Sequence, residues 1–234
     1  MVAGVLALML LAPPPYLAKE RFLADARALL PRHQEIPKMA AFAAGVFVLT
    51  RTDRKPSSWF ADHAPSELGR FEPLGRYQVG NVLGLGLFAW GVGASNPRLA
   101  SAGVAFVEAN LFSSLAVSGI QKLAGRQRPG YPHAGQFGRG GTSFPSAHAA
   151  HAFAAAGVAY TAFPEFRFRW SFPLLASAVA LSRVSDRKHF FADVAFSAGL
   201  GWWVGHRLGD SALGLGRVRW GLGPRGAVLA VSLP

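Results

Sequence analysis

Six apolar stretches, spread over most of the chain, set the narrowest limit on what it can fold into. They cover residues 39–50, 79–94, 100–120, 149–163, 172–182 and 192–205. Polar loops such as "RTDRKPSSWFADHAPSELGRFEP" separate them, and strand signals are weak throughout this region. Each stretch is therefore expected to form a buried or lipid-facing helix. The sequence predicts an all-α protein, a helical bundle of about six apolar helices.

Only 15% of the 234 residues are charged, whereas soluble domains average about 25%. The stretch at 100–120 is long enough to span a bilayer, and Trp202 and Trp203 could anchor a helix at its interface. Several other stretches fall short of the roughly 20 apolar residues that a span needs. We expect transmembrane helices; the alternative is a soluble or peripheral bundle with a very hydrophobic core.

The two ends of the chain differ from the bundle, which we expect to cover residues 17–210. Residues 1–16 hold an apolar run of signal-peptide length, without a basic segment before it, and Pro13 to Pro15 would end a helix there. This segment is either a cleaved signal peptide or a first apolar helix, and both interpretations point to the cell envelope. The tail, residues 211–234, has a Gly-Pro-Arg-Gly turn between two alternating runs, which predicts a short β-hairpin.

The charges are unbalanced, with 24 Lys and Arg against 12 Asp and Glu, a net charge of +12. Such an excess suits anionic lipid, an anionic substrate or nucleic acid. The basic residues lie in short loops rather than along one face, so no nucleic-acid partner is expected. The chain has no cysteine, which excludes disulfides, thiolate nucleophiles and Cys-based zinc sites.

The first of three polar segments, "QKLAGRQRP" at residues 121–129, ends an apolar helix. It contains Gln121, Lys122, Arg126 and Arg128. By itself this segment fits a basic helix end that faces anionic headgroups or the negative end of the helix dipole.

The second segment is "GTSFPSAHAAHAFAAAGVAY", in which Ser146 precedes an Ala-rich run and is the predicted N-cap of a helix. A helix N-terminus offers free N–H groups and can hold an anion. His148 falls in the first turn, close to such an anion. His151 lies one turn further on, and we expect it to be a packing residue. A His-x-x-His zinc pair is only weakly indicated without Cys or a nearby carboxylate, so no metal is expected.

The third segment, "SRVSDRKHFFAD" at residues 182–193, places charges between two nearly uncharged stretches. An interhelical loop would explain the charges at residues 186–188. It would not explain why His189 and Asp193, four residues apart, enter the next apolar helix. On a helix the two share a face and can hydrogen-bond. A carboxylate at one imidazole nitrogen leaves the other nitrogen as a base or nucleophile.

Together the segments supply three arginines (Arg126, Arg128 and Arg183), a lysine, a helix N-terminus and two histidines. Phosphoryl transfer needs donors around the phosphoryl oxygens, a nucleophile in line with the leaving group and an acid for that group. Arginine suits bidentate contact with phosphate. Because no Asp/Glu cluster for magnesium is evident, the expected chemistry uses neither a metal nor another cofactor.

In order and spacing, these segments resemble the signature of the type 2 phosphatidic acid phosphatase family, which includes bacterial acid phosphatases and vanadium haloperoxidases. That signature reads Lys-x6-Arg-Pro, then Pro-Ser-Gly-His, then Ser-Arg-x5-His-x3-Asp. The matching positions are Arg128 and Pro129, then Pro145, Ser146 and His148, then Ser182, Arg183, His189 and Asp193. The resemblance covers residues 121–193 and implies the family's helical bundle.

The sequence departs from this signature at two positions. Gln121 occupies the family's lysine position, and Lys122 follows it. Neighbours on a helix point about 100° apart, so Lys122 is not expected at the same phosphate oxygen. Ala147 replaces the signature glycine, which keeps the backbone N–H and adds a methyl group.

The resemblance implies that His189 attacks phosphorus and forms a phosphohistidine, with Asp193 orienting its ring. It implies that His148 protonates the leaving oxygen and then activates water. The implied phosphate-binding set is Arg128, Arg183, Ser146, Ala147, Lys122 and Gln121.

The leading hypothesis is a metal-independent phosphatase that hydrolyses a phosphomonoester or pyrophosphate, preferably of a lipid. Its expected partners are a phosphorylated lipid or small phosphate ester and a membrane. Its expected location is the inner membrane with the site facing the periplasm or exterior, or the periplasm itself if the protein is exported. The alternatives are a vanadium-dependent haloperoxidase and a non-catalytic phospholipid-binding membrane protein.

Overall fold

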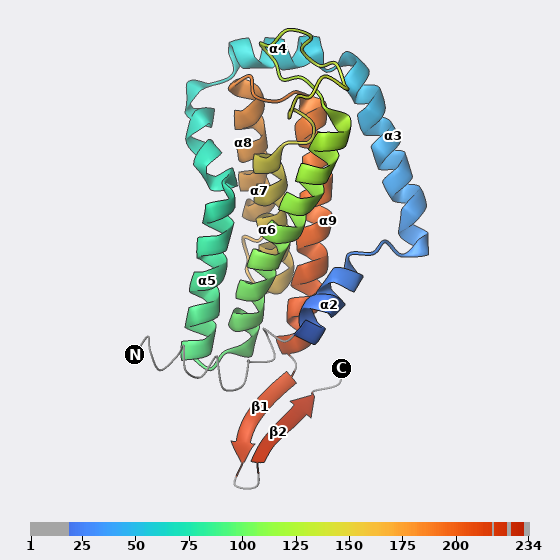
Figure 1. Ribbon diagram of the computed structural model, residues 1–234. Helices are drawn as coiled ribbons and strands as arrows, with labels where there is room; N and C mark the ends of the chain where they lie inside the picture. Colours follow the sequence, from blue (N-terminus) through green and yellow to red (C-terminus); the bar gives the residue numbers. More distant parts are fainter. Residues whose placement is uncertain (1–18, 217, 224–225, 232–234) are drawn as a thin grey trace.

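The computed structural model describes residues 19–216, 218–223 and 226–231 (Figure 1). Eight α-helices lie within these ranges: α2 Lys19–Ala28, α3 Ile36–Thr52, α4 Arg54–His63, α5 Tyr77–Gly93, α6 Pro97–Ala124, α7 Ala147–Ala162, α8 Ser171–Ser185 and α9 Phe191–Gly216. Two 3-10 segments are η2 His33–Glu35 and η3 Ser66–Gly75. Every predicted apolar stretch falls within α3 or α5 to α9, apart from single residues at helix ends, which confirms the helical bundle. The segment expected to be a signal peptide or first helix lies outside the described residues.

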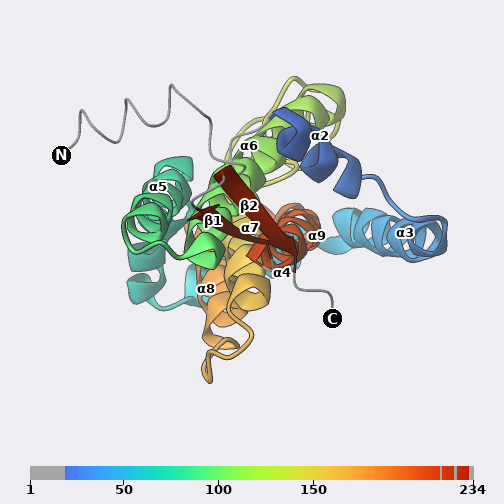
Figure 2. The ribbon, with the colours of Figure 1, turned by 90° about the horizontal axis from the view of Figure 1, so that it is seen from below.

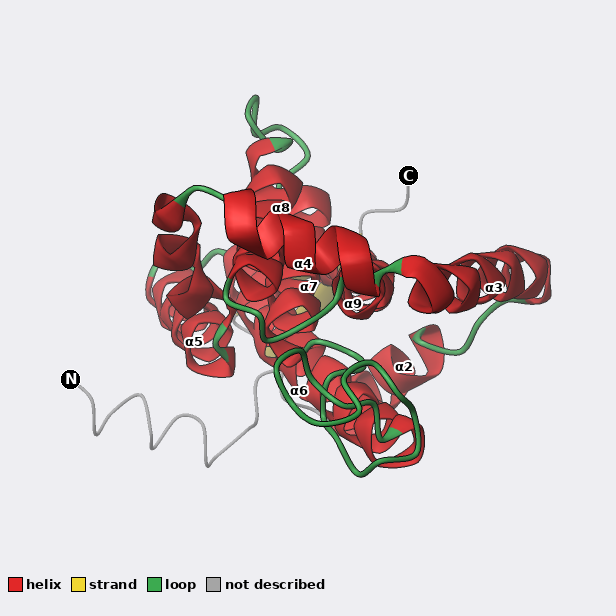
Figure 3. Cartoon of the chain, turned by 90° about the horizontal axis from the view of Figure 1, so that it is seen from above, coloured by secondary structure: helices red, strands yellow, loops and turns green. Residues whose placement is uncertain are grey.

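Helix α7 forms the centre of the bundle, packed against α5, α6, α8 and α9 (Figure 2). Its residues Ala150, Ala154 and Val158 are completely buried. Helix α3 stands apart and contacts α9, while α4 lies across one end of the bundle (Figures 1 and 3). This layered packing buries the Ala-rich face that the sequence placed after Ser146.

Helices α7 and α9 pack backbone to backbone because glycines of α9 face alanines of α7. A Cβ added at Gly201 would lie 2.2 Å from the carbonyl oxygen of Ala150. At Gly205 it would lie 2.0 Å from the carbonyl oxygen of Ala154. Such distances are far inside van der Waals contact, so only glycine fits. The close packing fixes the N-terminus of α9 relative to the rest of the bundle.

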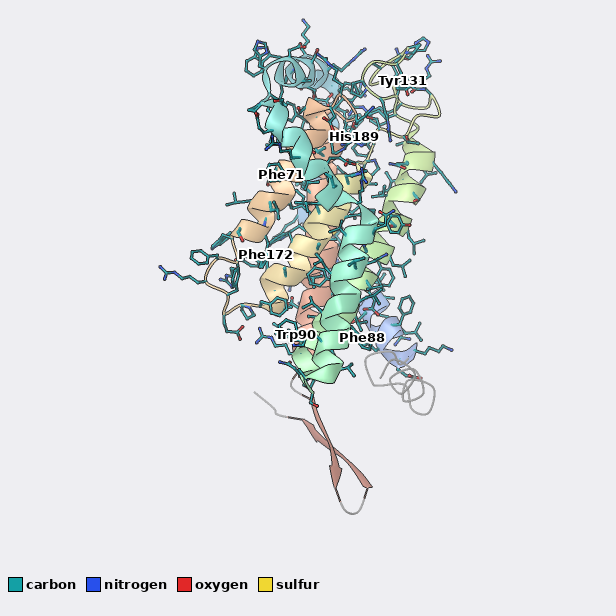
Figure 4. The ribbon with its side chains drawn as sticks, turned by 90° about the vertical axis from the view of Figure 1, so that its left-hand side faces the viewer. Phe71, Phe88, Trp90, Tyr131, Phe172 and His189 are labelled. Atoms are coloured by element: carbon teal, nitrogen blue, oxygen red, sulfur yellow. The ribbon has the colours of Figure 1, made fainter. Side chains whose placement is uncertain are left out.

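The three polar segments meet at the end of the bundle that α4 covers (Figure 3). Helices α6 and α8 end there and α9 begins there, so the loops at residues 125–146 and 186–190 lie together. Figure 4 shows His189 at this end, near the loop that carries Tyr131, while Phe88 and Trp90 lie toward the opposite end.

Within the described part of the chain, α6 alone is long and apolar enough to cross a membrane over an 18-residue segment. In that segment 44% of the residues are buried inside the bundle, as they would also be in a core helix of a soluble protein. In the described residues one helix, rather than about six, therefore has the length and composition of a membrane span.

The chain ends in a two-stranded antiparallel hairpin, β1 Val218–Gly223 and β2 Gly226–Val231. Val218 pairs with Val231, and Gly223 pairs with Gly226. This is the hairpin that the Gly-Pro-Arg-Gly turn predicts, and it follows α9 at the end of the bundle opposite α4 (Figure 1).

Candidate active site

His189 is held by a backbone carbonyl. Its Nδ1 lies 2.7 Å from the carbonyl oxygen of Ser143. A carbonyl oxygen can only accept a hydrogen bond, so Nδ1 carries the hydrogen. In the neutral ring Nε2 then has the free lone pair. The residue is buried, with His189 only 3% exposed. This arrangement leaves Nε2 as the nitrogen of the ring that is free to react.

The expected hydrogen bond between His189 and Asp193 is not formed, because their closest ring-to-carboxylate distance is 3.8 Å. The expectation assumed that both lie on one helix, whereas α9 begins at Phe191, after His189. Asp193 Oδ2 instead accepts the hydroxyl of Ser143 at 2.5 Å and the N–H of Phe190 at 2.8 Å. Asp193 thus holds the segments on both sides of the ring and places a negative charge near it.

Arg126 forms ion pairs with two buried carboxylates. Its Nη1 lies 2.6 Å from Asp193 Oδ1, and its Nη2 lies 2.7 Å from Asp53 Oδ1. All three side chains are fully buried, and the ring of Phe190 lies 4.4 Å from the guanidinium carbon. Arg126, counted above among the arginines available to phosphate, therefore serves to fasten α9 to the junction of α3 and α4.

Gln121 is bound to the loop that precedes α7. Its Nε2 donates to the carbonyl oxygens of Pro145 at 2.9 Å and Thr142 at 3.2 Å. Lys122, the next residue, is exposed and makes no hydrogen bond or ion pair with any described residue. At the family's lysine position the chain therefore has a side chain that supports the loop, with its charge displaced to the surface.

Ser146 takes the predicted N-cap position, directly before α7, but its hydroxyl does not cap the helix. Its N–H donates to Ser197 Oγ at 2.7 Å, and Ser197 Oγ donates to the carbonyl oxygen of Asp193 at 2.7 Å. The hydroxyl of Ser146 is completely buried and has no hydrogen-bond partner. The helix start at Ala147 adds backbone N–H groups that have no partner within the helix.

Three polar atoms at the predicted phosphate-binding positions are buried without a hydrogen-bond partner: Arg128 Nε, Arg183 Nε and Ser146 Oγ. Burial lowers the pKa of Arg183, and the nearby charge of Arg128 lowers it further. The two guanidinium groups therefore lie within electrostatic range of each other. Buried polar groups normally have partners, so these three atoms are available to hydrogen-bond a ligand.

The backbone of Arg183 explains the spacing of the third segment. Its carbonyl oxygen accepts the N–H groups of Lys188 at 3.0 Å and His189 at 3.2 Å. Arg187, which precedes both, adopts a left-handed conformation with φ of 54°, which turns the chain back. Meanwhile Arg183 Nη1 bonds Asp186 at 2.8 Å. The six-residue spacing from Arg183 thus places His189 beside the end of α8.

His148, in the first turn of α7, contacts a carboxylate that the sequence gave no reason to single out. Its Nε2 lies 2.8 Å from Glu72 Oε1 of η3. Burial and the charge of Arg183 lower the pKa of His148, and Glu72 opposes that shift. The charge of His189 also lowers it, so the two histidines lie within electrostatic range.

His151 is a packing residue, as predicted. Its Nε2 lies 2.9 Å from the hydroxyl of Ser114. Burial lowers its pKa to about 4, so it is neutral at physiological pH. Among the described residues no group of three His, Asp or Glu side chains could hold a metal ion.

The two histidines line different hollows. His189, with Pro129 and Arg54, lines one of about 180 Å³. His148, with Glu72 and Arg76, lines one of about 470 Å³. The two hollows share no lining residue, so they are separate openings at this end of the bundle.

No curated protein and no solved structure gives a match to this chain. The family model of the PAP2 superfamily matches residues 102–208, a range that runs from α6 into α9 and contains all nine candidate site positions. Over these residues, which make up less than half of the chain, it is similar to the PAP2 superfamily, and this similarity supports a phosphatase or haloperoxidase-type activity.

Proposed function

We propose that the protein is a metal-independent phosphatase that hydrolyses a phosphomonoester or pyrophosphate, preferably of a lipid, through a phosphohistidine on His189. The observation that carries the proposal is the set of unpartnered buried atoms Arg128 Nε, Arg183 Nε and Ser146 Oγ. All three can donate to phosphoryl oxygens, and the arginines supply charge as well. Together with the N-terminus of α7 they would bind an anion.

In the first step, Nε2 of His189 attacks phosphorus, and the bond from phosphorus to the leaving oxygen breaks. His148 gives its proton to that oxygen, so the leaving group departs as an alcohol or phosphate. The Ser143 carbonyl keeps the hydrogen on Nδ1, which leaves Nε2 free to attack. The Asp193 carboxylate, 3.8 Å away, favours the positive charge that the ring gains.

In the second step, water attacks the phosphohistidine, and His148, now neutral, takes a proton from it. The phosphorus–nitrogen bond breaks, phosphate leaves and His189 is restored. Arg128 and Arg183 would hold the oxygens through both steps. Removing one such donor typically lowers the rate by about 10²–10³.

Apolar side chains on the outside of the bundle support a lipid substrate and a membrane location. Among the described residues, large apolar side chains that are at least 60% exposed lie on five of the helices: Val48 on α3, Trp59 on α4, Val82, Leu85 and Trp90 on α5, Leu115 and Leu123 on α6, and Leu174 on α8. Exposed apolar surface on this scale is typical of a membrane or protein interface. We propose the inner membrane, with the site facing the periplasm or exterior.

The test is phosphate release by purified protein in a chelator, with a lipid phosphate and a small aryl phosphate as substrates. Wild type should release phosphate, and His189→Ala should not. His33→Ala, which changes an exposed histidine on η2, is the matched control and should behave as wild type. Acid quenching should trap phosphate on wild type and not on His189→Ala. Halide oxidation with vanadate and peroxide, without phosphate release, would instead establish the haloperoxidase.

A further inference from the structure

The carboxylate of Glu72 faces the imidazole of His148 at the candidate site. Its Oε1 lies 2.8 Å from Nε2 of His148 and 4.0 Å from Nη1 of Arg183. Its Oε2 lies 3.1 Å from Nη2 of Arg76. Glu72 belongs to η3, which precedes all three signature segments, and its side chain is 18% exposed. A residue outside the family match thus contacts the proposed acid directly.

This contact decides which nitrogen of His148 carries the hydrogen. Burial raises the pKa of Glu72, but hydrogen bonds and charges from Arg76, His148 and Arg183 outweigh it and hold the pKa below its usual value. An ionised carboxylate only accepts hydrogen bonds, so Nε2 of His148 carries the hydrogen. Nδ1 of His148 makes no hydrogen bond or ion pair with any described residue. It is the nitrogen left to exchange a proton with a substrate.

We propose that Glu72 is the positioning residue of His148, a role that rests on the proposed phosphatase function. It accepts the hydrogen of Nε2, fixes the tautomer that offers Nδ1 to the leaving oxygen, and stabilises the protonated ring. His189 is held in the same way, with one ring nitrogen on the acceptor oxygen of Ser143. Each proposed catalytic histidine therefore has one anchored nitrogen and one free nitrogen.

The chemistry explains why a carboxylate is needed at this point. The first step requires a protonated His148, while burial and the charge of Arg183 both favour the neutral ring. Glu72 supplies the opposing negative charge. The charged and titratable groups that interact with this pair are Arg76, Arg183, His189 and His151. Glu72 is the one carboxylate among these groups. Without it, His148 would be surrounded only by arginine and histidine side chains.

The same contact has a rival explanation, in which Glu72 occupies the place of the substrate's leaving oxygen and must be displaced. The two explanations differ in kinetics. Loss of a positioning carboxylate lowers kcat and moves the pH profile. Loss of a competing carboxylate lowers KM and leaves kcat unchanged.

The experiment compares Glu72→Gln and Glu72→Asp with wild type. Glu67→Gln is the matched control, because Glu67 lies on the same segment, is exposed and makes no contact that binds it to the site. kcat and KM are measured against pH on an aryl phosphate. The titration of His148 is followed by NMR in histidine-labelled protein, which needs no activity.

We expect Glu72→Gln to lower kcat about 10-fold to 100-fold, as when an outer partner of a functional histidine is lost. The alkaline limb of the profile and the NMR titration of His148 should both move to lower pH. Glu72→Asp, which keeps the charge, should recover part of the activity, and Glu67→Gln should match wild type.

A lower KM with unchanged kcat would overturn the inference and show that Glu72 competes with the substrate's leaving oxygen. An unchanged His148 titration in Glu72→Gln would overturn it as well. An inactive wild type, or an active His189→Ala, would instead contradict the proposed function. The NMR titration separates these cases, because it reports the effect of Glu72 on the pKa of His148 whether or not phosphate is released.

Discussion

The carbonyl oxygen of Ser143 lies 2.7 Å from Nδ1 of His189 and is the acceptor that sets the tautomer of this ring. The carboxylate of Asp193 contacts His189 only indirectly, because it accepts a hydrogen bond at 2.5 Å from the hydroxyl of the same serine. The conformation of the loop before α7 therefore determines how the candidate nucleophile is presented.

Ser143→Ala separates these two contacts, because it removes the hydroxyl and keeps the carbonyl. A hydrogen bond to a charged group contributes about 1.5–3 kcal/mol, so the free energy of unfolding should fall by about that amount. kcat should fall less than about 10-fold, since the acceptor at His189 remains. Urea unfolding and steady-state kinetics check both. Ser177→Ala is the control, because that hydroxyl bonds the carbonyl of Pro173 away from the site. A loss of activity as large as that of His189→Ala would contradict this account.

Arg126→Met should destabilise the protein strongly. It leaves the carboxylates of Asp53 and Asp193 buried without their cation. Breaking one side of a buried ion pair costs about 3–5 kcal/mol, measured as the free energy of unfolding in urea. Arg139→Met, an exposed arginine of the same loop, should change it by less than about 0.5 kcal/mol. Equal effects in the two variants would show that the buried network does not stabilise the fold.

The helices and the candidate site follow from the sequence to different extents. The apolar stretches predict the bundle because a helix that is buried on most of its surface requires a run of apolar residues. The Ala-rich run alone was sufficient to predict α7. His151 and the position of Ser146 also follow, since both depend on neighbours along one helix. Local pattern is sufficient in these cases.

The partners of the site residues could not be predicted, because they come from distant parts of the chain. Asp53 lies 73 residues from Arg126, and Ser143 lies 46 residues before His189. Glu72 belongs to a short 3-10 segment with no pattern of its own. The prediction of a direct hydrogen bond between His189 and Asp193 was wrong because the helix begins only at Phe191. His189 therefore lies outside the helix, and the assumed helical spacing does not apply.

Arg183→Lys should lower kcat/KM by about 10²–10³, since lysine offers one point charge in place of a planar pair of donors. The fold should persist, because the backbone carbonyl of Arg183, and not its side chain, holds the turn to His189. Inhibition by vanadate should weaken in parallel. Arg187→Lys, which alters an exposed ion pair with Asp62, is the control and should keep near-wild-type kinetics. An unchanged kcat/KM in Arg183→Lys would remove this side chain from the phosphate site.

The activity should be greatest at acidic pH. His148 must be protonated to act as the acid, and burial together with Arg183 lowers its pKa below the ordinary value of 6.5. A lowered pKa means that the protonated fraction is already falling as neutral pH is approached. kcat/KM should therefore decrease as pH rises from about 5 to 8, with the midpoint below 6.5. A profile that rises over this range would contradict the role of His148 as the acid in the first step.

Gly205→Ala tests whether the spacing of α7 and α9 supports the site. The added methyl carbon would lie 2.0 Å from the carbonyl oxygen of Ala154, so the helices must separate. Overpacking of this kind costs about 1–3 kcal/mol or more, despite the higher helix propensity of alanine. Gly214→Ala, on the same helix with open space around it, should instead be neutral or stabilising by up to about 1 kcal/mol. The positions of Asp193 and of Ser197, which binds the N–H of Ser146, depend on the same packing. We therefore expect kcat to fall in Gly205→Ala and not in Gly214→Ala. A variant that unfolds earlier yet retains full kcat would show that the site tolerates movement of α9.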